Sequence, residues 1–160
     1  MRTLAIASVI LSLAAMSGCD RSAHKLALAD RKMCAAQAEH VFASSGWSLT
    51  GAVTRIRGME SSGTYMSHYN ARMRKCFMEL FSRTVDMSKK EYTLSTIVSD
   101  AFEGTAYATY TEVWSGEPAH VRVDECILTV PNSPPKQCTA GTEWNLLVQP
   151  LIETGTVAQQ

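Results

Sequence analysis

The N-terminal third of the chain contains one clear helical pattern. Between residues 30 and 46, a set of mostly apolar side chains recurs at the spacing of one helix face. The set consists of Met33, Cys34, Gln37, Ala38, Val41 and Phe42. Asp30 is the expected N-cap, and Gly46 is expected just after the last turn. Residues 47–63 contain several glycines and serines, so they are expected to be mostly irregular, with one short strand near residues 52–56.

Alternating patterns in the middle of the chain predict β-strands. In residues 71–85 the alternation puts Cys76, Met78 and Leu80 on one face and Phe77, Phe81 and Val85 on the other. Residues 92–102, 105–114 and 119–130 are rich in β-branched and aromatic side chains, which favour strands. The connections between these segments are short, so neighbouring strands are expected to be antiparallel.

The C-terminal pattern is helical again. Trp144, Leu147, Val148 and Leu151 have the spacing of one helix face, with Thr142 as the expected N-cap. Pro150 removes a backbone hydrogen bond and predicts a short helix.

Together these patterns predict a single α+β domain over residues 30–153. Its expected order is an N-terminal helix, an antiparallel β-meander of about four strands and a short C-terminal helix. Residues 19–29 are expected to form a tether, and residues 154–160 a frayed tail.

Residues 1–18 have the layout of a secretory signal peptide. Arg2 supplies a positive charge, an uncharged run extends from Leu4 to Ala15, and the small residues Ser17 and Gly18 follow. This run is shorter than the roughly 20 apolar residues that a transmembrane helix needs. A cleaved leader is therefore favoured over a permanent membrane span.

The stretch Met16-Ser17-Gly18-Cys19 resembles the lipobox of bacterial lipoproteins, although Met16 stands where leucine is usual. The resemblance implies cleavage before Cys19 and acylation of Cys19, with palmitate among the chains. It also implies a cell-envelope protein that is held at the membrane and faces the periplasm. Asp20 resembles the signal for retention in the inner membrane, so the inner membrane is favoured over the outer. The alternative is an ordinary signal peptide with a cysteine nearby.

The other four cysteines predict two disulfide bonds, because an even number in an exported chain is typical of a disulfide framework. Three pairings are possible. The pairs Cys34–Cys76 and Cys126–Cys138 are favoured because each then closes a local loop. A zinc site is the alternative, but the cysteines and histidines lack zinc-ligand spacing, and no metal is expected.

Charge gives no indication of a nucleic-acid partner. The chain has 15 Lys and Arg and 15 Asp and Glu residues, and loss of Arg2 with the leader leaves a net charge of about −1.

The most suggestive polar stretch is Ser67-His68-Tyr69-Asn70. It precedes a predicted strand, where His68, Tyr69 and Asn70 could line a polar cleft. The alternative is that these side chains satisfy backbone groups where the strand begins.

Three other sets of residues have simpler interpretations. Asp100 and Glu103 flank a turn and are expected to cap backbone amides. His24, His40 and His120 are scattered and are expected to be solvated. Tyr107, Tyr110 and Trp114 form either a surface stripe for an interface or part of the core, and the core is favoured.

Several short motifs together resemble a group of uncharacterised bacterial exported proteins, namely residues 34–38, 65–70, 75–77 and 100–104 and the pair Cys126/Cys138 before Glu143-Trp144. That group has no assigned activity. The sequence therefore predicts a lipid-anchored envelope protein with a non-catalytic binding or interaction domain. Its expected partner, besides the membrane, is an envelope protein or a small ligand, and no cofactor is expected. The alternatives are a small exported enzyme with a site around His68 and an envelope inhibitor or exclusion factor.

Overall fold

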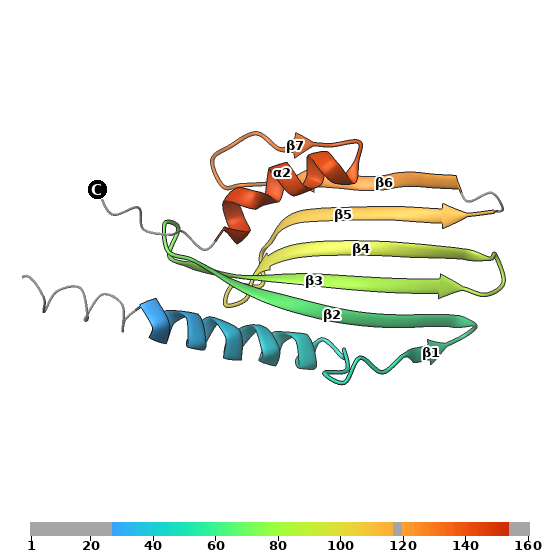
Figure 1. The fold of residues 1–160 in the computed structure, drawn as a ribbon, viewed down its shortest axis with the longest axis horizontal. Coiled ribbons are helices and arrows are strands. Elements are labelled where there is room, and N and C mark those ends of the chain that lie inside the picture. The colour runs from blue at the N-terminus through green and yellow to red at the C-terminus, as the bar shows by residue number, and fades with distance from the viewer. Residues whose placement is uncertain (1–26, 117–119, 154–160) are drawn as a thin grey trace, which may run out of the picture.

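The computed structural model of the chain describes residues 27–116 and 120–153 (Figure 1). Residues 27–44 are helical, a seven-stranded sheet follows, and helix α2 (Gly141–Ile152) ends the described chain. The predicted leader, Cys19, Asp20, His24 and the tail 154–160 lie outside the described residues.

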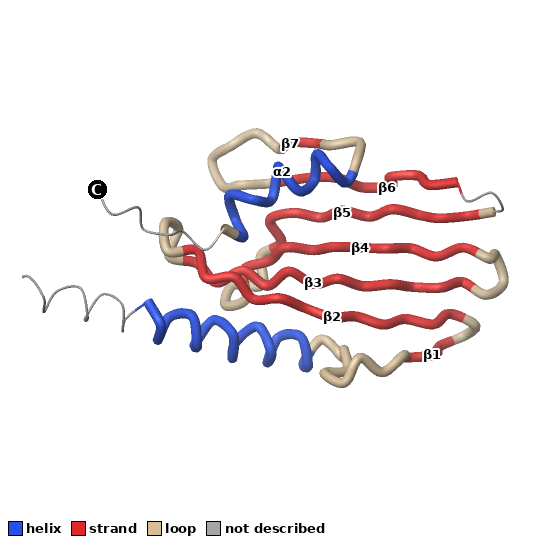
Figure 2. Tube along the Cα trace, viewed as in Figure 1, coloured by secondary structure: helices blue, strands red, loops and turns tan. Residues whose placement is uncertain are grey.

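The sheet is an antiparallel meander in which each strand pairs with the next (Figure 2). Its strands are β1 (Thr54–Ile56), β2 (Met59–Asn70), β3 (Lys75–Asp86), β4 (Glu91–Asp100), β5 (Ala106–Ser115), β6 (His120–Leu128) and β7 (Lys136–Gln137). The α+β class and the antiparallel arrangement agree with the sequence prediction.

The strand count differs from the prediction of about four strands. Strand β2 begins within residues 47–63, which were expected to be mostly irregular, and continues through residues 64–70, for which no strand was predicted. Its serines and glycine are weak strand formers. It is stabilised by pairing with β3 along its whole length. Residues 71–74, predicted to begin a strand, form the β2–β3 turn, in which Arg74 has a φ of 53°.

Two of the predicted helix caps are wrong. Asp30 lies inside the first helix, which is already helical at residue 27. The N-cap of α2 is Ala140, so Thr142 lies inside that helix. The Glu143 carboxylate instead accepts hydrogen bonds from the backbone N–H and the hydroxyl of Thr139, which lower the pKa of Glu143. Gly46, with a φ of 85°, follows the first helix as predicted.

The two helices pack on opposite faces of the sheet. Alternation along β3 puts Cys76 and Met78 against the N-terminal helix and Phe77 in the cluster that contains α2, as the sequence pattern predicted. The N-terminal helix contributes Cys34, Ala38 and Phe42 to its cluster. Helix α2 contributes Trp144, Val148 and Leu151 to the cluster on the other face.

The structure contains the two disulfide bonds that the sequence predicted. They join Cys34 to Cys76 and Cys126 to Cys138, with Cα–Cα distances of 5.3 and 5.2 Å. The first ties the N-terminal helix to β3, and the second ties β6 to the segment just before α2.

The helices cover only one half of the sheet. Helix α2 has 12 residues and so is about 18 Å long, whereas the 12 residues of β3 span about 40 Å. We call the half that carries the β2–β3 and β4–β5 turns the covered half, because the helical clusters are centred there and the Cys34–Cys76 bond lies there. Cys126 of the second disulfide lies opposite Tyr110, at the boundary between the halves. The other half carries the β1–β2 and β3–β4 turns, and we call it the open half. In Figure 1, α2 lies over one end of the strands and leaves the other end of β3, β4 and β5 bare.

Candidate functional site

The predicted polar cleft at His68, Tyr69 and Asn70 is divided between the two faces of the sheet. These residues end β2, where successive side chains point to opposite faces. Tyr69 packs on the N-terminal-helix side, and a hydrogen bond to Asp30 raises the pKa of Tyr69. His68 and Asn70 lie on the α2 side. The structure therefore brings two of the three residues to one face.

His68 and Asn70 each have partners within the fold. The His68 Nε2 atom lies 3.2 Å from Glu79 Oε2, and these side chains are 14% and 8% exposed. The Asn70 amide donates to the carbonyl oxygens of Pro150 and Leu151, at 2.8 and 3.0 Å. Asn70 thus satisfies carbonyls at the end of α2 that have no partner within the helix. These contacts give Asn70 a structural role.

Asp100 and Glu103 meet Lys75 at the outer end of the covered half. The Lys75 ammonium donates to both carboxylates, at 2.7 and 2.8 Å, and these bonds raise the pKa of Lys75. Asp100 also accepts the backbone N–H groups of Phe102 and Glu103, as predicted for a turn acid. Burial raises the pKa of Asp100, but its hydrogen bonds to Lys75 and to these amides outweigh burial and hold the pKa below its usual value.

Residues 27–116 and 120–153 contain neither a membrane-crossing helix nor a cluster of metal-ligating side chains. Neither helix there combines the length and hydrophobicity of a membrane-crossing segment. No three His, Cys, Asp or Glu side chains in these ranges gather as a metal site would require. His40 and His120 are exposed there, as expected.

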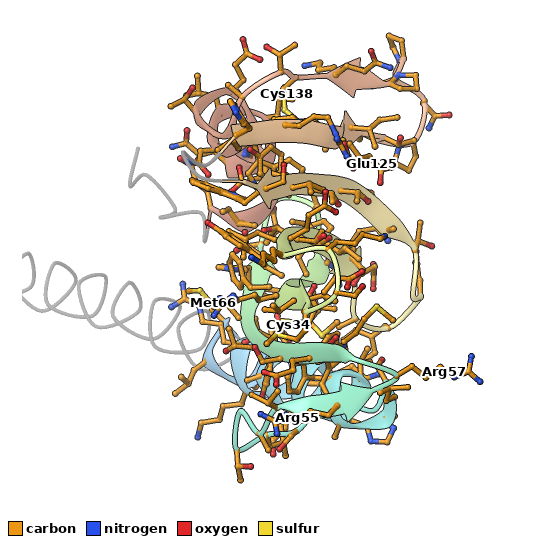
Figure 3. All side chains as sticks on the ribbon, turned by 90° about the vertical axis from the view of Figure 1, so that its right-hand side faces the viewer. Cys34, Arg55, Arg57, Met66, Glu125 and Cys138 are labelled. Atoms are coloured by element: carbon orange, nitrogen blue, oxygen red, sulfur yellow. A yellow bond between two sulfur atoms is a disulfide. The ribbon has the colours of Figure 1, made fainter. Side chains whose placement is uncertain are left out.

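The open half presents a continuous surface on the face that α2 covers elsewhere. We call it the open surface, and it consists of Ser62, Thr64, Phe81, Arg83, Val85, Tyr92, Leu94, Thr96, Glu112, Trp114 and Val121. The strand register sets it out in rows, such as Val85, Tyr92, Trp114 and Val121. Figure 3 views the sheet from this end, with Met66 projecting to the side of this face and Arg57 extending from the β1–β2 turn.

A shallow trough of about 430 Å³ lies within the open surface. Side chains that line it are Thr64, Phe81, Arg83, Leu94, Tyr110 and Glu112. Phe81 and Leu94 are half-buried and form an apolar floor, and Gly51 approaches from the loop before β1. Ligand sites are commonly concave and mostly apolar, with a few polar groups that orient the ligand. The trough has this composition.

Hydrogen bonds along β5 fix the aromatic side chains around the trough. Tyr110, Glu112 and Trp114 lie at alternate positions and so share a face. The two Glu112 oxygens accept the Tyr110 hydroxyl at 2.7 Å and the Trp114 indole N–H at 2.9 Å. Burial and the neighbouring Glu112 raise the pKa of Tyr110 to about 12. Both rings are thus held by one carboxylate.

A stack of side chains continues from Trp114 to a cation. The Trp114 and Tyr92 rings are stacked with centroids 5.4 Å apart, and the Arg83 guanidinium lies 5.4 Å from the Tyr92 centroid. The stack crosses β5, β4 and β3 and ends beside the trough, where Arg83 is exposed. Aromatic pairs and cation–π contacts of this kind restrict the directions that the guanidinium can take.

Two other depressions are more polar. One of about 500 Å³ lies beside the Cys126–Cys138 bond and is lined in part by Asp124, Glu125 and Gln137. The other, of about 370 Å³, lies at the start of the N-terminal helix and contains the ion pairs of Lys75. The larger one has the acidic pair on β6, before the part of that strand that pairs with β7. In the smaller one Lys75 is already paired with Asp100 and Glu103. We therefore take the trough as the candidate site.

Sequence reasoning identified only part of this site. A core position was favoured for Tyr107, Tyr110 and Trp114. Tyr107 and Tyr110 are buried in the core as predicted. Trp114 instead belongs to the open surface. Phe81 and Leu94 lay in predicted strands, but nothing local indicated that α2 would stop short of them.

Comparison with protein-family models, with curated proteins and with solved structures finds no match to this chain. The site therefore has to be interpreted from its own geometry.

Proposed function

We propose that this chain is a lipid-anchored cell-envelope protein whose domain acts by binding at the open surface rather than by catalysis. The anchor is Cys19, and Asp20 favours retention in the inner membrane with the domain in the periplasm. The lipobox resemblance supports the anchor. The two disulfides support an oxidising compartment, where such bonds persist.

One observation carries the binding proposal, namely that half of a well-packed sheet is left uncovered around an apolar trough. Apolar surface exposed to water costs about 25 cal/mol per Å² relative to burial. An exposed apolar patch on a soluble domain commonly marks a binding site. The ordered Tyr110, Glu112 and Trp114 side chains favour recognition, because their orientations are already set.

The enzyme alternative has less support from the described side chains. His68 and Glu79 are nearly enclosed in the covered half, and His68 Nε2 is engaged by Glu79 Oε2. A buried pair of this kind is typical of a structural role.

The anchor is tested by intact-mass spectrometry of the protein extracted from bacterial membranes. We expect a chain that begins at Cys19 and carries acyl mass, and an unmodified chain from the Cys19→Ala variant. A wild-type chain with an unmodified Cys19 would contradict the anchor.

The binding surface is tested by photocrosslinking in intact bacteria. A photoreactive amino acid replaces Leu94 in the trough or, as a matched control, Leu146, which is 71% exposed on α2. We expect an adduct from position 94 and none from position 146. Equal labelling at both positions, or none at either, would contradict a binding role for the open surface.

A further inference from the structure

The Arg83 guanidinium is the cation of the trough that the fold leaves available for a ligand. None of the ion pairs among the described residues includes Arg83. It is exposed, yet its contact with Tyr92 and the stacking of Tyr92 on Trp114 hold it at the edge of the trough. An arginine placed in this way can bind a carboxylate or phosphate through two parallel hydrogen bonds.

The other charged group of the trough is already engaged. Both oxygens of Glu112 accept hydrogen bonds, from Tyr110 and from Trp114. Arg83 on β3 and Glu112 on β5 each lie opposite Leu94 on β4, so one strand separates them. Two strand spacings amount to about 10 Å. An anionic group can therefore lie at Arg83 without meeting the Glu112 carboxylate directly.

The remainder of the trough suits an apolar chain. Phe81 and Leu94 form the floor, and the neighbouring polar groups are the uncharged hydroxyls of Ser62, Thr64 and Thr96. A volume of about 430 Å³ lies within the range of roughly 300–1,000 Å³ that is usual for small-ligand sites. An apolar floor with one cation at its side is complementary to a molecule with an apolar chain and one negative charge.

We propose that the trough binds an anionic amphiphile, with its apolar chain on Phe81 and Leu94 and its carboxylate or phosphate at Arg83. The inference rests on the proposed binding function of the open surface, and it names the chemical class of the ligand. A neutral amphiphile would contact only the apolar floor of Phe81 and Leu94. A cationic amphiphile would be repelled by the positive charge of Arg83.

The test uses the mature chain, residues 19–160, with Cys19→Ser so that no attached acyl chain competes. Binding of dodecanoate, dodecan-1-ol and dodecyltrimethylammonium is measured by calorimetry below their micelle-forming concentrations. We expect dodecanoate to bind at one site and to bind more tightly than the other two. Arg83→Gln should weaken dodecanoate binding about 10- to 100-fold, the effect of losing hydrogen bonds between charged groups, and should leave dodecanol binding unchanged.

Two further variants separate the charge from the apolar floor. Arg55→Gln removes an exposed arginine that pairs with Glu60 on neighbouring strands, and it should leave dodecanoate binding unchanged. Leu94→Ser should weaken the binding of both dodecanoate and dodecanol.

Three results would overturn the inference: no saturable dodecanoate binding, equal binding by wild type and Arg83→Gln, or equal losses from Arg83→Gln and Arg55→Gln. If dodecanol still binds and Leu94→Ser weakens it, the proposed function stands and only the ligand class is wrong. If neither amphiphile binds and position 94 gives no crosslink, both proposals fail.

Discussion

The covered and open halves of the sheet are built from the same strands but differ in what lies on them. In the covered half, one face packs against the N-terminal helix and the other against α2, and the Cys34–Cys76 bond is there. In the open half, aromatic and aliphatic side chains of the same strands stay partly exposed, and the contacts between them run from strand to strand. The comparison suggests that the covered half stabilises the fold and the open half is available for a ligand.

Phe77 and Phe81 allow the most direct test of this difference between the halves, because they lie on the same strand and the same face. Phe77 is 0% exposed and packs edge-on against Tyr107, whereas Phe81 is half-buried beside the trough. Phe77→Ala should lower the free energy of unfolding by about 4 kcal/mol. Phe81→Ala should lower it by about 1 kcal/mol. Urea denaturation followed by circular dichroism measures both, and equal losses would mean that the halves do not differ in this way.

The two disulfides allow a second comparison. Their loops differ in length, with sequence separations of 42 for Cys34–Cys76 and 12 for Cys126–Cys138. In the chain-entropy model, replacing a pair by serines should cost about 4 kcal/mol for the longer loop and about 3 kcal/mol for the shorter one. Thermal unfolding of the two double variants measures the difference. A larger loss from Cys126 and Cys138 would show that loop length does not control their effect.

Gly63 on β2 contacts Trp47, which packs against the N-terminal-helix cluster on the other face of the sheet. A Cβ atom at this position would lie 2.6 Å from the Trp47 ring, so the ring requires a glycine in β2. Gly63→Ala should destabilise the fold by about 2 kcal/mol through overpacking. Combining it with Trp47→Ala should remove most of that penalty in a double-mutant cycle of unfolding free energies. Additive losses would contradict direct contact between the two residues.

Replacing Asp100 is expected to change the free energy of unfolding least, and this change should depend on pH. Because the pKa of Asp100 is lower in the folded state than in the unfolded state, Asp100 stabilises the fold above the unfolded pKa near 4. That contribution is lost as the pH falls through the lower folded pKa. Asp100→Asn should therefore cost about 1 kcal/mol at pH 7, since Lys75 keeps Glu103 as a partner.

The measurement for Asp100 is urea denaturation between pH 7 and pH 2 on both proteins. The difference between wild type and Asp100→Asn should shrink toward the acid end. A difference that stays constant with pH would show that the carboxylate charge does not contribute.

Local patterns were enough to predict the helices, the disulfides and the hairpins after residue 75. Their signals are helical spacing around Cys34 and Trp144, the cysteine count, and the β-branched run of β4. Strand β2 could not be predicted in this way. Gly63 weakens its strand pattern, yet the fold needs glycine there because the distant Trp47 ring lies on it. Tertiary packing outweighs local preference at this position.

The trough depends on two features that no local pattern contains. One is the length of α2, which ends before it reaches the half-buried Phe81 and Leu94. The other is the strand register, which brings Arg83, Leu94 and Glu112 side by side from three strands. The sequence therefore predicts a binding domain but gives no indication of which surface would bind.

The most direct test of a binding role for the open half is an NMR titration of the ¹⁵N-labelled mature chain, with Cys19→Ser, against dodecanoate. We expect saturable shifts of backbone amides at Phe81, Arg83 and Leu94, and little change at Phe77 and Val98 in the covered half. Shifts centred on the covered half, or none that saturate, would contradict it.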